Sequence, residues 1–254
     1  MATPDSGFCP SKNLGEPAED EVGRYARTPQ QDQPHPGATD DMEPRPDHGE
    51  RSYQGHGLLE NRHSAITGGD SGIGRAVAIA FAREGADVVF SYLPEEEKDA
   101  QETVRLIGEA GRRAIPVACD IREEANCRDL VNRAGEAFGS IDILVNTTSV
   151  QAYKPSPHLL DYATTKGAIV TFTQGLAGNL AERGIRVNAV APGPVWTPLI
   201  PATLPDTSTF GEESPLRRPP QPAETAPAYV FLASQQASYV TAEVLNATGG
   251  TPLP

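Results

Sequence analysis

Cysteines are few in this sequence, and long apolar runs are absent. The three cysteines, Cys9, Cys119 and Cys127, form neither an even disulfide set nor a metal-binding spacing. This use of cysteine is typical of a reducing compartment, so we expect a cytoplasmic protein with no bound metal. No segment approaches the roughly 18 apolar residues of a membrane-spanning helix. The acidic N-terminal residues also lack the apolar core of a signal peptide, and we expect neither a signal peptide nor a transit peptide.

Basic residues are scarce as well. The chain has 21 lysines and arginines against 34 aspartates and glutamates, a net charge of −13. Residues 1–50 hold 11 acidic and 4 basic side chains, a net charge of −7, so the remainder is only mildly acidic. No basic stripe offers a surface to nucleic acid or to an anionic membrane. We therefore expect a small-molecule partner, and neither nucleic acid nor membrane.

Composition divides the chain into two parts. Residues 1–56 contain eight prolines, few aliphatic side chains and no periodicity, so they bury too little apolar surface to offset the entropy of ordering. We expect an acidic, proline-rich tail over 1–56 that is disordered or wraps the surface, and one domain over 57–254. Four histidines fit no metal-binding spacing, and we expect solvated side chains for them: His35, His48, His56 and His63.

A glycine-rich turn occupies residues 67–74, with the sequence Thr-Gly-Gly-Asp-Ser-Gly-Ile-Gly. It follows the apolar pair at 65–66 and precedes a helical pattern, so it predicts a strand, a turn and a helix. Glycines there let the backbone approach a pyrophosphate, which the helix N-terminus attracts. Taken alone, the turn is weak evidence for nucleotide binding, because many strand-to-helix turns carry glycines for steric reasons only. A P-loop is excluded, since Arg75 follows the last glycine in place of lysine.

Apolar runs alternate with helical patterns along the rest of the chain. This alternation predicts an α/β fold, a Rossmann-like doubly wound parallel sheet that binds its ligand at the carboxyl ends of the strands. The proline-rich stretch at 198–221 is long for a compact domain and is predicted to be a substrate lid. Strands are expected near 86–92, 114–119, 141–145, 185–191 and 244–245, and helices near 72–84, 95–110, 123–138, 162–182 and 223–233.

A second motif lies near the middle of the chain. Tyr162 and Lys166 are four residues apart in a helical pattern, so they share a face of that helix. Ser149 precedes the tyrosine by 162 − 149 = 13 residues. A phenol with the ordinary pKa of about 10 is a poor base at neutral pH, and a nearby positive charge stabilises its anion.

Together these motifs, with Arg186-Val187-Asn188 leading to Pro192-Gly193 and Thr197, resemble the classical short-chain dehydrogenase/reductase family and in particular its extended bacterial members. The resemblance runs from about residue 58 to the C-terminus. It implies an NAD(P)-dependent oxidoreductase that transfers hydride between the nicotinamide and a small alcohol or carbonyl compound. Ser149, Tyr162 and Lys166 would be catalytic. The resemblance also implies a homotetramer.

The resemblance further implies a cofactor site. The glycine-rich turn would hold the pyrophosphate, Asp120 and Ile121 the adenine, and Val195 and Thr197 the nicotinamide end. The choice between NAD and NADP stays open: residues 92–94 hold no acid for a ribose hydroxyl, and Arg75 is the one basic candidate for a 2′-phosphate, opposed by the glutamates at 95–97. The complete implied set is Gly68, Ser71, Gly72, Ile73, Gly74, Tyr92, Asp120, Ile121, Asn146, Tyr162, Lys166, Pro192, Gly193, Val195 and Thr197.

One stretch departs from the family pattern. Between Asp120 and Ser149 the sequence has room for one helix and one strand, whereas the family has a further strand–helix unit of about 30–50 residues. We expect a sheet one strand and one helix shorter than in the family, in which residues 141–148 fill two strand positions. The family's catalytic asparagine then has no counterpart, and part of the tetramer interface is missing. The alternatives are a catalytically impaired or inactive nucleotide-binding remnant and a chain that does not fold stably.

Overall fold

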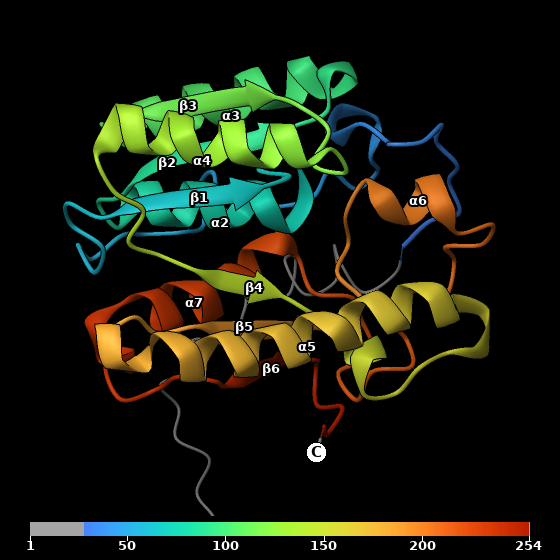
Figure 1. Ribbon diagram of the computed structural model, residues 1–254. Helices are drawn as coiled ribbons and strands as arrows, with labels where there is room; N and C mark the ends of the chain where they lie inside the picture. Colours follow the sequence, from blue (N-terminus) through green and yellow to red (C-terminus); the bar gives the residue numbers. More distant parts are fainter. Residues whose placement is uncertain (1–27, 254) are drawn as a thin grey trace, which may run out of the picture.

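The computed structural model describes residues 28–253; residues 1–27, which include Cys9, and Pro254 lie outside the described part. The described chain contains two three-stranded parallel sheets, each covered by helices (Figure 1). The first sheet is ordered β1-β2-β3 and the second β4-β5-β6. Their strands are β1 (His63–Thr67), β2 (Asp87–Tyr92), β3 (Ala114–Ala118), β4 (Val145–Thr147), β5 (Asn188–Pro192) and β6 (Val244–Ala247).

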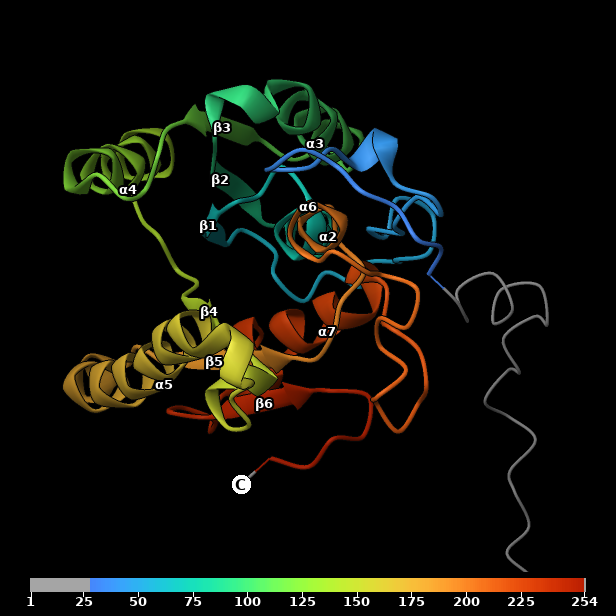
Figure 2. The ribbon, with the colours of Figure 1, turned by 90° about the vertical axis from the view of Figure 1, so that its right-hand side faces the viewer.

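Helices cover both faces of the sheets (Figure 2). On the first sheet, α2 and α3 pack on one face and α4 on the other, while α5 and α7 pack on opposite faces of the second. The prediction of a Rossmann-like α/β fold with parallel strands is confirmed, but the strands form two three-stranded sheets and not the single sheet predicted. None of the helices between residues 28 and 253 has the length and apolarity to cross a membrane. The main helices are α2 (Gly72–Arg83), α3 (Glu97–Glu109), α4 (Glu124–Phe138), α5 (Leu160–Leu180) and α7 (Pro222–Ala233).

The first strand–helix–strand unit is built by near-continuous apolar sequence. All six residues of β2 are buried, as expected for a strand with a neighbour on each side. Helix α2 buries a run from Ala76 to Ala82 against β1, β2 and α7. It ends where Gly85 adopts φ +100°, a left-handed conformation that glycine adopts without steric cost. This rigid unit fixes the position of the glycine-rich turn.

A single segment connects the two sheets. Ile143 forms an isolated parallel bridge with Ser64 of the first sheet, and two residues later Val145 pairs with Asn188 of the second. The strand predicted from residue 141 therefore begins at Val145. Between α4 and Ser149 the structure has this one strand and no further helix. Leu144, between the two contacts, leaves 41% of its surface exposed.

Residues 28–56, which we call the strap, lie across α3 and near α6 (Figure 2). The indole Nε1 of Trp196 donates to the carbonyl oxygen of Pro44 at 2.9 Å, and the hydroxyl of Tyr53 donates to Glu84 at 2.6 Å. The prediction of a solvated His48 is wrong. Its side chain is fully buried, with Nδ1 at 3.2 Å from a carboxylate oxygen of Glu50, and burial lowers the pKa of the imidazole.

The stretch at 198–221 contains the short helix α6 (Leu199–Thr203) and is tied to the strap. The backbone N–H of Gln33 donates to the carbonyl of Pro201 at 3.2 Å. Further along, the backbone N–H of Thr207 donates to the side chain of Gln30 at 2.8 Å. The role of residues 198–221 as a substrate lid stays a prediction.

Candidate functional site

The glycine-rich turn lies between β1 and α2, at the carboxyl end of the first sheet. Gly68 adopts φ +64°, and an added Cβ there would meet no atom within 4 Å, so the backbone is open on that side. At Gly74 an added Cβ would overlap the carbonyl of Gly68 and lie 2.7 Å from its carbon. Ser71 makes no side-chain capping bond, which leaves the first N–H groups of α2 available to an anion. An open glycine cradle with an uncapped helix N-terminus fits the pyrophosphate of a dinucleotide.

Arg75 is not available for a 2′-phosphate, and this sequence-based candidate is wrong. Its side chain is fully buried. The guanidinium donates to Asp99 at 2.6 Å, to the backbone carbonyl of Asp70 at 2.6 Å and to the hydroxyl of Thr103 at 3.1 Å. The arginine therefore fastens the turn to α3 and faces away from the solvent that a phosphate group would occupy.

A carboxyl group that the sequence analysis considered only as opposing a 2′-phosphate lies beside the turn. Glu96 ends the short 3₁₀ helix Pro94–Glu96 after β2, and its Oε2 accepts from the backbone N–H of Leu93 at 3.3 Å. Burial, with the neighbouring charges of Asp70 and Asp99, raises the pKa of Glu96 to about 7. The proline that opens this helical turn was the signal that could have located an acid folded back toward the end of β2.

Glu96 gives the stability of the protein a pH dependence. Because its folded pKa of about 7 lies above the ordinary value of 4.5, the folded state binds this proton more tightly. The stabilisation is complete below about pH 4.5 and is lost as the pH rises to about 7. We expect Glu96→Gln to melt at a higher temperature than wild type at pH 8 and at the same temperature at pH 4.5. Calorimetry at both pH values measures this. An equal difference at both would contradict it, and Glu109→Gln is the control.

Among the predicted cofactor residues, Tyr92 ends β2, and the two predicted at the adenine, Asp120 and Ile121, follow β3. Tyr92 is buried and its hydroxyl donates to Glu97 at 2.5 Å, so it supports the start of α3 rather than presenting a free polar group. Asp120 pairs with Arg122, which lowers the pKa of the aspartate to about 2. Ile121 is 45% exposed and offers an apolar surface at this edge.

The segment after β5 brings the second half of the molecule to the turn. Pro192 ends β5, and the backbone N–H of Gly193 donates to Ala247 at 2.9 Å. The methyl group of Thr197 lies 3.1 Å from the position of an added Cβ at Gly72. Val195, two residues before it, is buried. The structure thus brings Thr197, predicted at the nicotinamide end, against the glycine-rich turn.

Ser149, Tyr162 and Lys166 gather where β4 meets the start of α5. Ser149 precedes the 3₁₀ helix Val150–Ala152, which packs against α5. The ammonium of Lys166 lies 5.4 Å from the centre of the Tyr162 ring and donates to the carbonyl of Thr147 at 3.1 Å. Burial lowers the pKa of Lys166. Tyr162 is 39% exposed, so its ring is accessible to a ligand.

Neighbouring side chains hold this arrangement in place. The hydroxyl of Thr148 donates to the carbonyl of Lys166 at 2.8 Å, which joins β4 to α5. The amide of Asn146, a predicted cofactor contact, donates to Thr173 of α5 at 2.9 Å. Thr147 and Tyr229 pair through their hydroxyls at 2.8 Å. Asn146 therefore supports α5, and its nitrogen is already bonded.

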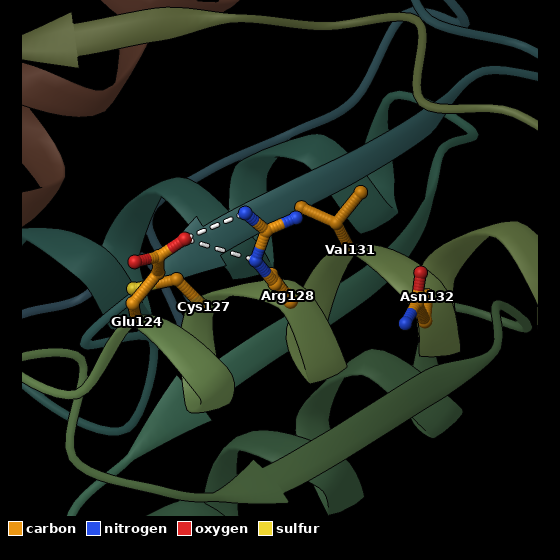
Figure 3. A pocket seen from close by; sticks show the side chains of 5 residues that line it. All are labelled: Glu124, Cys127, Arg128, Val131 and Asn132. Carbon is orange, nitrogen blue, oxygen red and sulfur yellow. Dashed lines mark hydrogen bonds and ion pairs between the residues drawn. The ribbon is translucent and has the colours of Figure 1, made fainter.

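A shallow hollow on α4 contains none of these residues (Figure 3). Its five lining residues all belong to that one helix: Glu124, Cys127, Arg128, Val131 and Asn132. Glu124 and Arg128 pair across one turn at 2.6 Å. It is a feature of one exposed helix face and not part of the candidate site.

Two family models match the chain in succession. The model for short chain dehydrogenases matches residues 62–148, and the model described as enoyl-(acyl carrier protein) reductase matches residues 144–251. The uncharacterized oxidoreductase YghA of Escherichia coli is 45% identical, over 91% of this chain and 96% of the relative. The chain belongs to the short-chain dehydrogenase/reductase family. Another relative, NADPH-dependent aldehyde reductase 1 (chloroplastic) of Arabidopsis thaliana, is 42% identical over 85% of this chain and 94% of its own.

Solved structures of this family have the same fold. A short chain dehydrogenase from Burkholderia cenocepacia in complex with NADP has a TM-score of 0.71 and 28% identity, covering 76% of this chain and 98% of its own. A 3-ketoacyl-(acyl-carrier-protein) reductase from Brucella melitensis complexed with NADH has a TM-score of 0.69 and 30% identity, covering 76% and 98%.

This short-chain dehydrogenase/reductase is shorter than its relative within the aligned region. The alignment with YghA runs over 284 positions, and the whole chain has 254 residues. At least 284 − 254 = 30 positions of the relative therefore have no counterpart here. The two family models meet at residues 144–148. These residues include β4, the one strand between α4 and Ser149 in the described structure.

Proposed function

We propose that this chain is an NAD(P)-dependent oxidoreductase that transfers hydride between the nicotinamide and a small alcohol or carbonyl substrate. One observation carries the proposal: Lys166 places its ammonium 5.4 Å from the accessible ring of Tyr162, on the helix that packs against the segment after Ser149. The glycine-rich turn, with its open face and uncapped helix, would hold the pyrophosphate.

The three polar residues can each perform one task. A nicotinamide cofactor bound there would supply or accept the hydride. Tyr162 donates a proton from Oη to the carbonyl oxygen during reduction and accepts one from the hydroxyl during oxidation. Lys166 supplies the positive charge that favours a phenolate beside it. Ser149 Oγ already accepts from the N–H of Gln151 at 3.2 Å, so its own proton is free to donate to the substrate oxygen and orient it.

Cofactor binding is expected to stabilise the folded protein. A ligand at 100 times its dissociation constant adds about 2.7 kcal/mol, which for a chain of this size raises the melting temperature by about 5–11 °C. Thermal unfolding with NAD⁺, NADH, NADP⁺ and NADPH measures the effect, with ATP as a charged nucleotide control. Absence of a shift with all four dinucleotides would contradict the proposal.

A second candidate function is cofactor binding without turnover. The observation that favours it is the direct path from α4 through β4 to Ser149, with no helix in this described stretch to carry the family's catalytic asparagine. We infer that a strand–helix unit is missing at residues 144–148. A cofactor-dependent thermal shift without turnover of any aldehyde, ketone or alcohol in a broad panel would select this candidate.

The remaining assignments follow from the proposed function. A small alcohol or carbonyl compound is the partner, and the proposed location is the cytoplasm. We propose residues 57–254 as the catalytic domain and residues 1–56 as its N-terminal extension. A homotetramer would have to form without the surface of the missing helix. Phe172 on α5 remains 57% exposed in the single chain.

A further inference from the structure

The strap, residues 28–56, is anchored to the helices of the first sheet. The backbone N–H of Thr39 donates to Asp99 of α3 at 3.1 Å. Toward the other end of the strap, the hydroxyl of Tyr53 donates to Glu84, the residue that ends α2, at 2.6 Å. Thr39 and Glu84 are both fully buried. The strap therefore has a fixed position relative to α2 and α3, which cover one face of the sheet that carries the glycine-rich turn.

The strap also binds the residues that follow β5. We call residues 193–210 the post-β5 segment; its helix α6 lies beside the strap (Figure 2). The side chain of Gln30 donates from Nε2 to the carbonyl of Pro205 at 3.0 Å and accepts from the backbone N–H of Thr207 at 2.8 Å. The hydroxyl of Thr207 donates in turn to the carbonyl of Pro29 at 2.8 Å, and Thr207 is fully buried. The strap thus joins the post-β5 segment to the helices of the first sheet.

Contacts with the strap lie on both sides of Thr197 in the sequence. Before it, the fully buried Trp196 donates from its indole Nε1 to the strap carbonyl of Pro44 at 2.9 Å. After it, the carbonyl oxygen of Pro198 lies 2.5 Å from the position of an added Cβ at Gly37 of the strap. Gly37 adopts φ +86°, a conformation that glycine adopts without steric cost, so the two backbones can approach this closely. The strap therefore holds the residue on each side of Thr197.

The post-β5 segment has little regular structure of its own to fix Thr197. Between β5 and α7, all of which is described, the one helix or strand is the five-residue α6. Thr197 nevertheless has to keep its methyl group against the turn, 3.1 Å from the position of an added Cβ at Gly72. A segment that is already held in its binding conformation does not have to be ordered when a ligand binds, and this increases affinity.

We propose that the strap positions Thr197, and with it the nicotinamide end of the cofactor site, through its contacts with Trp196 and Pro198. This inference rests on the proposed function and adds the N-terminal extension to the parts of the chain that orient the nicotinamide. Gly37 and Trp196 are positioning residues in this proposal, because they act through Thr197. A change in the strap should therefore weaken the binding of the nicotinamide half of the cofactor and leave the binding of the adenosine half unchanged.

The test is calorimetric titration of the full chain with each reduced dinucleotide and with the fragment that lacks its nicotinamide. The pairs are NADH with ADP-ribose and NADPH with 2′-phospho-ADP-ribose. In the wild-type chain the preferred dinucleotide should bind more tightly than its fragment. Gly37→Ala pushes on the backbone of Pro198 and should weaken that dinucleotide by at least about 5-fold, a typical coupling between two sites, with the affinity of the fragment unchanged. Gln30→Ala removes two contacts to the post-β5 segment and should act in the same direction.

Two matched controls should keep the wild-type ratio of dinucleotide to fragment affinity. Gly57→Ala carries the same kind of backbone strain, at φ +74°, but the nearest atoms to its added Cβ belong to the flexible side chain of Glu60. Gln101→Ala removes an exposed glutamine that bonds to Glu97 within α3 at 2.7 Å. The fluorescence of the bound dihydronicotinamide, excited directly, is a second readout. In Gly37→Ala it should move toward that of the free dinucleotide, which a loss of stability alone would not cause.

The outcomes separate this inference from the proposed function. An unchanged affinity ratio in both Gly37→Ala and Gln30→Ala overturns the positioning role of the strap and leaves the proposed function standing. Equal binding of dinucleotide and fragment by the wild-type chain has the same meaning. Failure of the wild-type chain to bind any of the four ligands overturns both. Gln30 is exposed, so Gln30→Ala decides the question if Gly37→Ala does not fold.

Discussion

Replacing Tyr162 with phenylalanine is expected to lower kcat/KM for carbonyl reduction by about 10²–10⁴-fold, the usual contribution of a positioned acid–base group. The substitution removes one hydroxyl and retains the ring over which Lys166 lies at 5.4 Å. Because the ring is 39% exposed, little buried structure depends on that hydroxyl. Thermal stability and the cofactor-induced shift should therefore be unchanged.

The matched control is Tyr239→Phe. Tyr239 is fully exposed beyond α7, so the same chemical change there should leave turnover unaffected. Steady-state kinetics with one aldehyde substrate compares the two variants. Equal activity of Tyr162→Phe and wild type would remove Tyr162 from the proton-transfer role, even if the cofactor still binds.

Replacing Gly74 with alanine is expected to destabilise the protein by about 3 kcal/mol, the upper end of the range of about 1–3 kcal/mol that overpacking typically costs. The new methyl group would overlap the carbonyl of Gly68, and that carbonyl belongs to the backbone of the turn. No side-chain rotation relieves the overlap. Helix and turn must separate, so the cofactor-dependent shift should be lost together with stability.

Gly108→Ala is the control for this substitution. Gly108 lies near the end of α3, and an added Cβ there meets nothing within 4 Å. Alanine is about 1 kcal/mol more favourable than glycine inside a helix, so this variant should be slightly stabilised. Chemical denaturation of both variants measures the contrast. A Gly74→Ala protein as stable as wild type would show that the turn and α2 are not packed as described.

Periodicity and turn chemistry predicted the regular part of the fold closely. The helix expected at 72–84 is Gly72–Arg83, and the strand expected at 86–92 is Asp87–Tyr92. Both are local patterns, in which apolar spacing and a terminal glycine determine the element. The shared helix face of Tyr162 and Lys166 could equally be predicted from the sequence, because residues four apart on a helix lie on the same face.

Features that depend on contacts distant in sequence could not be predicted in this way. Arg75 is charged and follows a turn, which suggested a ligand contact, but Asp99 of the next helix buries it. His48 lies in a polar, aperiodic tail, and its burial depends on how that tail folds back.

The two halves of the candidate site stand on different sheets. The glycine-rich turn extends from β1, whereas Tyr162 and Lys166 stand on the helix that packs on β4 and β5. The first sheet contacts the segment before β4 at one isolated bridge, Ser64 to Ile143, and no ladder of hydrogen bonds between the described strands fixes the distance from one sheet to the other. The packing of α2 against α7 sets that distance instead. The positions of the hydride-transfer and proton-transfer groups relative to each other therefore depend on the interface between α2 and α7. A change at this interface can abolish turnover while the protein still binds its cofactor.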